Sequence, residues 1–167
     1  MRSTQRRTMP SPQYLQSLCV LVALGVSPLS ATAQDGPVDD PSVDSVRATI
    51  VSLAAHYEAG ELDEAGRIFA EGPSVHIIEG TGVNHGWTDY RDNHLAPEIQ
   101  SFENFRYRYF AVEPVVVQDM SYVAFRYELA ADTPSGHVET EGRGTAVLRR
   151  MSDGWKIVHL HTSGRRR

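Results

Sequence analysis

The chain has 167 residues, with 16 basic and 21 acidic side chains and a formal net charge of −5. This acidic balance disfavours a nucleic-acid partner, and we expect none. The single cysteine, Cys19, excludes an intramolecular disulfide and any metal site built from several thiolates.

The first 33 residues have the three-part pattern of a secretory signal peptide. Three arginines form a basic start, residues 15–26 are mostly apolar, and Ala31-Thr32-Ala33 matches a cleavage site before Gln34. The apolar segment is short for a membrane span. We therefore predict cleavage after Ala33, export to the periplasm or the medium, and no membrane contact afterwards.

Helical and turn signals fill the next part of the chain. Residues 34–42 are rich in Asp, Pro and Gly, which predicts a flexible lead-in. Apolar residues recur at helical spacing over 46–57, and a glycine then ends the predicted helix. A second short helix is expected over 61–70, followed by a strand over 75–79 and a turn and loop over 80–86.

A third helix is predicted over 87–95. Trp87, Tyr90 and His94 recur at positions i, i+3 and i+7 and so share one face of it. Pro97 lacks a backbone donor, so we expect it to open a new turn rather than continue the helix.

From residue 103 onward the apolar residues alternate with a period of two, which is typical of strands. The predicted strands cover residues 105–117, 122–130, 138–150 and 155–162, with a bulge near Pro114 in the first. Helices followed by strands predict an α+β fold over residues 43–164, a curved antiparallel sheet covered by N-terminal helices.

The last strand carries the most informative pattern. Because strand side chains alternate, Trp155, Ile157, His159 and His161 should all face the same side. The two imidazoles would lie about 7 Å apart beside an apolar floor. This pattern predicts the wall of a small-molecule pocket.

Charged residues alternate along the same predicted strands. We expect them to form a solvated outer face with cross-strand ion pairs. They are Arg106, Arg108, Arg126, Glu139, Glu141, Arg143 and Arg149.

Three stretches of the chain resemble the SnoaL-like branch of the nuclear transport factor 2-like superfamily. They are residues 59–63, residues 79–98 from Glu79-Gly80 through Gly86-Trp87 to Pro97-Glu98, and residues 142–161, which end in Trp-x-Ile-x-His-x-His. The resemblance implies a cone-shaped α+β barrel that encloses a pocket, often in a homodimer. The superfamily includes polyketide cyclases, ketosteroid isomerases and dehydratases, and also members that only bind or associate.

We predict an exported protein that binds a small molecule. If it is an isomerase, cyclase or dehydratase, His159 or His94 would be the base, and Tyr90 would donate a hydrogen bond to the developing oxyanion. The ligand-binding residues expected around the pocket are Trp87, Tyr107, Trp155, Ile157, His161 and Glu79.

Metal binding is an alternative function. His-x-His on a strand supplies two imidazoles, so His94, His159 and His161 are the expected ligands, with His76, Glu79 or Glu98 as further ones. Copper and zinc are the first candidates because imidazole suits both. A non-catalytic association module is a third function class, so the sequence leaves open whether the protein is an enzyme.

Overall fold

The computed structural model describes residues 41–167, so the predicted signal peptide and most of the lead-in lie outside the described residues. The helices are α1 (Pro41–Ala59), α2 (Leu62–Gly66), α3 (Trp87–Tyr90), a π-helical turn (Arg91–Leu95) and α4 (Ala96–Ser101). The strands are β1 (His76–Glu79), β2 (Gly82–His85), β3 (Glu103–Val117), β4 (Met120–Thr133), β5 (Gly136–Met151) and β6 (Gly154–Arg166). Within residues 41–167, no helix is both long enough and apolar enough to cross a membrane.

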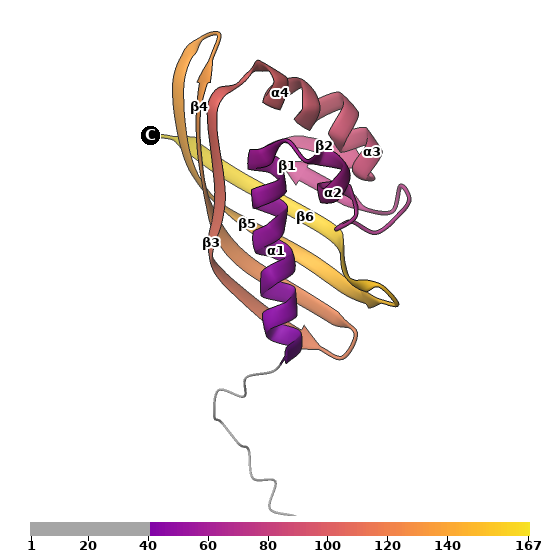
Figure 1. Ribbon diagram of the computed structural model, residues 1–167. Helices are drawn as coiled ribbons and strands as arrows, with labels where there is room; N and C mark the ends of the chain where they lie inside the picture. The colour runs from indigo at the N-terminus through magenta and orange to yellow at the C-terminus, as the bar shows by residue number, and fades with distance from the viewer. Residues whose placement is uncertain (1–40) are drawn as a thin grey trace, which may run out of the picture. The chain divides into compact units, whose positions relative to one another are not determined.

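The six strands form one curved sheet in the order β2-β1-β6-β5-β4-β3, and the helices lie on one face of it (Figure 1). Strand β1 runs parallel to β6, and all other neighbouring strands are antiparallel. The predicted α+β class is confirmed. The sheet differs from the predicted antiparallel barrel in being mixed and open, with β2 and β3 as its edges.

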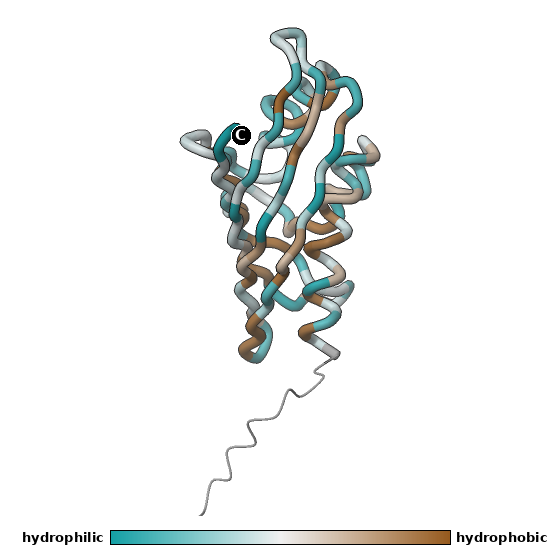
Figure 2. Tube along the Cα trace, turned by 90° about the vertical axis from the view of Figure 1, so that its left-hand side faces the viewer, coloured by the Kyte–Doolittle hydropathy of each residue, from teal (hydrophilic) through white to brown (hydrophobic). Residues whose placement is uncertain are grey.

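Helix α1 packs its predicted apolar stripe against the sheet. Val46, Ile50, Leu53 and Tyr57 are at most 2% exposed, as their helical spacing predicts. Apolar and polar residues also alternate along the strands, so each strand has one face toward this core (Figure 2). The helix begins at Pro41, so the last two residues of the predicted lead-in are helical.

Strand β2 was not predicted. It forms a hairpin with β1, and the turn uses Gly80 at a φ of 59°, a left-handed conformation that favours glycine. The predicted turn and loop over 80–86 therefore contain an edge strand of four residues.

Strand β3 forms the other edge, and its pairing with β4 is interrupted twice. The register shifts between Glu103 and Arg106 and again between Phe110 and Glu113, where Ala111 has a φ of 48°. The second irregularity confirms the bulge predicted near Pro114.

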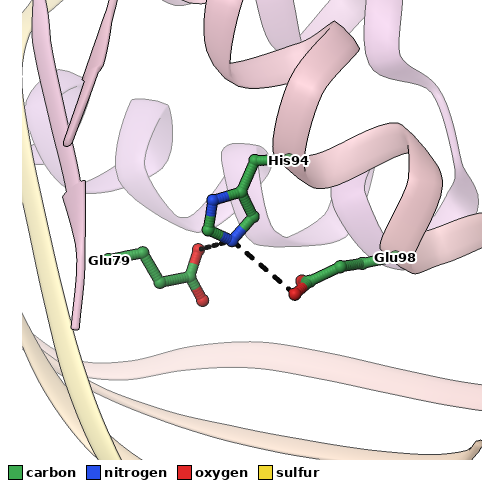
Figure 3. Close-up of side chains that lie close together, drawn as sticks. All are labelled: Glu79, His94 and Glu98. Atoms are coloured by element: carbon green, nitrogen blue, oxygen red, sulfur yellow. Dashed lines mark ion pairs between the residues drawn. The ribbon is translucent and has the colours of Figure 1, made fainter. Parts of the chain in front are cut away.

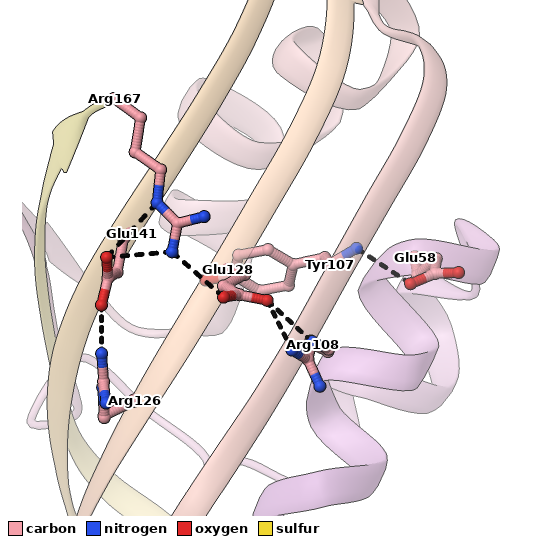
Figure 4. A network of polar contacts seen from close by, with 7 residues as sticks. All are labelled: Glu58, Tyr107, Arg108, Arg126, Glu128, Glu141 and Arg167. Carbon is pink, nitrogen blue, oxygen red and sulfur yellow. Dashed lines mark hydrogen bonds and ion pairs between the residues drawn. The ribbon is translucent and has the colours of Figure 1, made fainter.

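Ion pairs link the strands on the outer face of the sheet, the face away from the helices (Figure 4). Arg108 lies 2.6 Å from Glu128, and Arg167 lies 3.2 Å from Glu128 and 2.9 Å from Glu141. Arg126 also pairs with Glu141. The predicted solvated face is confirmed, with cross-strand ion pairs at Arg108, Arg126 and Glu141. Solvent screens such exposed pairs, so they add little to stability.

A β-bulge in β6 changes which side chains face the core. Ile157 pairs with Leu148, but His159 pairs with the preceding residue of β5, Val147. Val158 is therefore an extra residue, and the alternation of side chains shifts by one position after it.

Burial follows the shifted alternation. Ile157 is fully buried before the bulge, and Leu160 and Thr162 are 2% and 4% exposed after it. His159 and His161 therefore point to the outer face. The prediction that both histidines share a face with the two apolar residues at the start of the strand is wrong.

Close packing around one glycine of β5 predicts that adding a single methyl group there destabilises the fold. Gly144 pairs with Phe125, and a Cβ at Gly144 would overlap the phenyl ring, whose centroid lies 4.3 Å from that of Tyr109. Phe125 is only 3% exposed and has little room to move. We expect Gly144→Ala to lower the free energy of unfolding by about 1–3 kcal/mol in urea denaturation.

The neighbouring exposed position supplies the control. Thr145→Ala on the outer face should change the free energy of unfolding by less than about 0.5 kcal/mol. An equal decrease in the free energy of unfolding for the two substitutions would contradict the packing argument.

Candidate functional site

Three ionisable side chains meet on the helical side of the sheet. Nε2 of His94 lies 3.5 Å from Oε2 of Glu79 and 3.6 Å from Oε1 of Glu98, and Figure 3 shows the imidazole between the two carboxylates. The hydroxyl of Tyr90 donates a hydrogen bond of 2.9 Å to the same Oε2 of Glu79. The side chains of His94 and Glu79 are 24% and 32% exposed, so a ligand from solvent can reach them.

Local structure explains why these residues meet. Glu79 ends β1 on the inner face of the sheet, opposite the buried Thr162 of β6. His94 lies in the π-helical turn, and Glu98 follows four residues later in α4. Pro97 cannot donate to the carbonyl four residues before it, which favours a break from α-helical hydrogen bonding at this point.

The helical stripe predicted from the sequence is confirmed by ring contacts. The ring centroids of Trp87 and Tyr90 lie 6.0 Å apart, and those of Tyr90 and His94 lie 5.2 Å apart. The helical run continues from α3 through the π-helical turn into α4, which begins at Ala96. Pro97 therefore continues the run, and the prediction that it opens a new turn is wrong.

Asp89 fixes the start of this helical run to the edge of the sheet. Its carboxylate accepts hydrogen bonds of 2.8 Å from the backbone N–H of His85 and from the side-chain amide of Asn93. These hydrogen bonds lower the pKa of Asp89. The carboxylate therefore stays charged and holds β2 against α3.

Four buried tyrosines lie behind the cluster. The ring of Tyr57 lies 6.5 Å from that of Tyr90 and 6.0 Å from that of Tyr107, whose hydroxyl donates to Tyr109 at 3.3 Å. Burial raises the pKa of each of these phenols, and the charge of Glu79 raises it further. The four hydroxyls are therefore neutral hydrogen-bond donors at physiological pH.

Tyr57 has a hydroxyl that is unusual among the described residues. The oxygen is buried and has no hydrogen-bond partner in residues 41–167. An unpaired buried hydroxyl costs about 1–3 kcal/mol, so an acceptor brought by a ligand would recover part of that cost.

Glu98 has a different electrostatic environment. Partial burial raises the pKa of this carboxyl, the negative charge of Glu79 raises it further, and His94 opposes both. Glu98 therefore takes up a proton at a higher pH than an ordinary glutamate.

This arrangement can exchange protons, and it can also present metal ligands. One ligand atom from each of Glu79, His94 and Glu98 lies within 4.8 Å of the other two. Direct coordination needs distances of about 2.0–2.2 Å, so the side chains would have to close on an ion. One imidazole and two carboxylates suit zinc.

The structure brings together part of the predicted site. Tyr90 and His94 of the predicted catalytic set meet at Glu79, and Tyr107 and Trp87 lie among the aromatic rings behind them. His159 and His161 are on the opposite face of the sheet, so His94 is separate from the other two predicted metal ligands.

The predicted apolar floor also lies elsewhere. Ile157 exchanges backbone hydrogen bonds of 2.9 Å with Ile68 and Ala70, which places the start of β6 beneath the segment after α2. Trp155 is covered on one side by the guanidinium of Arg150, 4.8 Å from the ring centroid. Neither Trp155 nor Ile157 contributes to the Glu79 cluster.

Sequence analysis missed Tyr57 as a functional candidate. Its place in the apolar stripe of α1 predicts an ordinary core position. The available signal was chemical: a hydroxyl on a fully buried stripe needs a partner.

The family model of the SnoaL-like domain matches residues 46–165. The chain belongs to this family. No curated protein matches the sequence of this SnoaL-like protein.

Solved structures share the fold at low sequence identity. A nuclear transport factor 2-like superfamily protein from Salmonella enterica is 21% identical with a TM-score of 0.63, over 72% of this chain and 92% of that one. A proposed dehydratase from Streptomyces avermitilis is 19% identical with a TM-score of 0.64, over 72% and 94%. A proposed calcium/calmodulin-dependent protein kinase II association domain from Xanthomonas campestris is 15% identical with a TM-score of 0.60, over 72% and 85%. At these identities the similarity establishes the fold of the SnoaL-like protein alone.

The raised pKa of Glu98 predicts a pH effect on stability. The folded protein binds this proton more tightly than the unfolded chain, so the resulting stability is present below the unfolded pKa of about 4.3. It is lost as the pH rises through the raised folded pKa. We expect Glu98→Gln to raise the free energy of unfolding at pH 7 and to weaken its decline above about pH 4.

Urea denaturation across this pH range tests the effect, with Glu103→Gln at an exposed position of β3 as the matched control. The control should keep the pH dependence of the parent protein. A Glu98→Gln variant with the same pH dependence as the parent would refute the assignment.

Proposed function

We propose that this SnoaL-like protein catalyses proton transfer on a small carbonyl compound, as in isomerisation or dehydration. Glu79 and His94 are the residues that exchange the proton. The main support is one carboxylate oxygen, Oε2 of Glu79, which accepts a hydrogen bond from the buried Tyr90 and faces Nε2 of His94.

Each residue has a chemical role in this proposal. Tyr90 fixes the Glu79 carboxylate through the 2.9 Å hydrogen bond, so that its second oxygen can remove a proton next to a carbonyl group. His94 then exchanges that proton with Glu79 or returns it to another atom of the substrate. A positioned acid or base of this kind contributes about 10²–10⁴-fold to a rate.

The buried phenols supply the electrostatic part. Removing a proton beside a carbonyl group places negative charge on the carbonyl oxygen, and neutral donors aimed at that oxygen stabilise it. Tyr57 is the best candidate, because its buried hydroxyl has no other acceptor among the described residues and its raised pKa keeps the proton in place. The rings of Trp87 and Tyr107 stack on Tyr57, so the surroundings of this hydroxyl are apolar and favour a flat, largely apolar substrate.

Substitution of the shared carboxylate tests the proposal. We expect Glu79→Gln to lower the rate of proton exchange by about 10²–10⁴-fold, because the amide keeps the shape but cannot accept the proton. The measurement is deuterium incorporation from heavy water into small cyclic enones and β-hydroxy ketones, followed by NMR. Tyr57→Phe should lower the exchange rate by a smaller factor, because it removes only the hydrogen bond to the developing oxyanion.

His137→Asn is the matched control, because His137 lies at the exposed start of β5 and pairs with Asp132 of β4. Its exchange rate should equal that of the parent protein. If no substrate exchanges, or if Glu79→Gln exchanges as fast as the control, the protein does not perform this chemistry at Glu79. That result would favour the non-catalytic association function.

The proposal includes export and a homodimer as the working form. Export is supported by the signal-peptide pattern of residues 1–33. The homodimer is supported by a patch of exposed apolar side chains on the outer face of the sheet, next to the β3–β4 turn. Exposed apolar patches often mark protein interfaces. Val115, Val117, Met120 and Tyr122 are each between 41% and 61% exposed.

Protein recovered from the periplasm of an expressing bacterium tests both points. Its intact mass should correspond to a chain beginning at Gln34, and light scattering should give twice that mass. Val115→Glu should yield monomers, because it places a charge in the patch, whereas Val51→Glu on the exposed side of α1 should leave dimers. An uncleaved chain contradicts the export proposal, and a monomeric parent protein contradicts the dimer.

A further inference from the structure

The seven histidines of the chain divide into two groups. Three of them face carboxylates: His56 lies 2.8 Å from Glu61, His137 lies 2.7 Å from Asp132, and His94 lies between Glu79 and Glu98. Within residues 41–167, the other four form no ion pair, and all four lie on the outer face of the sheet. They are His76, His85, His159 and His161.

Strand pairing collects these four side chains in one place. His76 of β1 is the partner of His159 across the parallel β1–β6 pair, and it is also the partner of His85 across the β1–β2 hairpin. Partners on neighbouring strands point to the same face, so the three imidazoles form a row across three strands. The rings of His76 and His85 already meet edge to face, with centroids 5.1 Å apart.

The bulge at Val158 adds the fourth imidazole. It turns His159 and His161 outward together, two residues apart on β6. Without the extra residue, both would face the core. We propose that His76, His159 and His161 form a binding site for a divalent transition-metal ion, with His85 as a fourth ligand.

The spacing suits coordination by three imidazoles. Neighbouring strands lie about 4.8 Å apart, and residues two apart on a strand are separated by about 6.6 Å. The Nε2 atom of a histidine lies farther from its Cα than half of either distance, so three such side chains on two adjacent strands can converge on one ion at about 2.0–2.1 Å. His76 and His85 are exposed, and rotation about their side-chain bonds costs little packing.

The surroundings select the class of metal. Imidazole suits zinc and copper, whereas calcium and magnesium require oxygen ligands. Among the described residues, no carboxylate forms an ion pair with the imidazole of any of these four histidines. The partly buried Ile78 and Val147 flank the histidines on the same face and would shield the ion from water. The site is independent of the Glu79 cluster, which lies on the other face of the sheet.

Zinc titration of the chain, purified without a polyhistidine tag, tests the site by calorimetry. We expect about one equivalent to bind, and we expect His159→Asn and His76→Asn each to weaken the affinity at least tenfold, since loss of even an outer-shell partner costs about 10–100-fold. Cobalt should show the strong visible absorption of a tetrahedral complex in the parent protein and lose it in these variants. Magnesium should not compete.

Three matched histidine variants make the result specific. His56→Asn and His137→Asn should bind zinc as the parent protein does, and circular dichroism should show every variant folded. His94→Asn should also retain the affinity, because His94 belongs to the Glu79 cluster. Absence of zinc binding tighter than about 1 mM would overturn the proposal, and so would zinc binding that His94→Asn removes and His159→Asn leaves intact.

Discussion

The parallel pairing of β1 with β6 is the constraint on which both sites depend. It brings a strand of four residues from the middle of the chain beside the last strand, with His76 opposite His159 and Glu79 opposite Thr162. Because side chains alternate along β1, one short strand contributes to both faces of the sheet. Glu79 reaches the tyrosines beneath the helices, and His76 joins the histidines outside.

The bulge in β6 determines which residues of that strand lie on each face of the sheet. Before Val158 the inner face carries Ile157, and after it the inner face carries Leu160 and Thr162. The shift puts a small buried threonine next to Glu79, where a histidine would otherwise stand. One inserted residue therefore determines the chemical character of both faces of the strand.

Much of the fold could be predicted from the sequence, because its signals are local. The stripe of α1, the ring contacts of Trp87, Tyr90 and His94, and the irregularity near Pro114 all follow from spacing within one element. Strand β2 was missed because four residues after a glycine-rich turn are too few to show a period.

The candidate site was predicted only in part, because its decisive features are not local. Strict alternation along the last strand places Trp155 and His161 on the same face. Only Leu160, an apolar residue at a position that strict alternation assigns to the opposite face, indicates that the alternation shifts. The approach of Glu79 to His94 and Glu98 depends on how β1 joins the sheet, which no spacing within the chain reveals.

The open sheet leaves two edges whose backbone groups could recruit strands from other molecules. On β3 the register irregularities, the positive φ of Ala111 and the missing N–H of Pro114 interrupt the row of donors and acceptors. Strand β2 is too short to be a good template. Edge-to-edge aggregation is thus disfavoured at both ends of the sheet, so the proposed homodimer would form through a sheet face and not through a sheet edge.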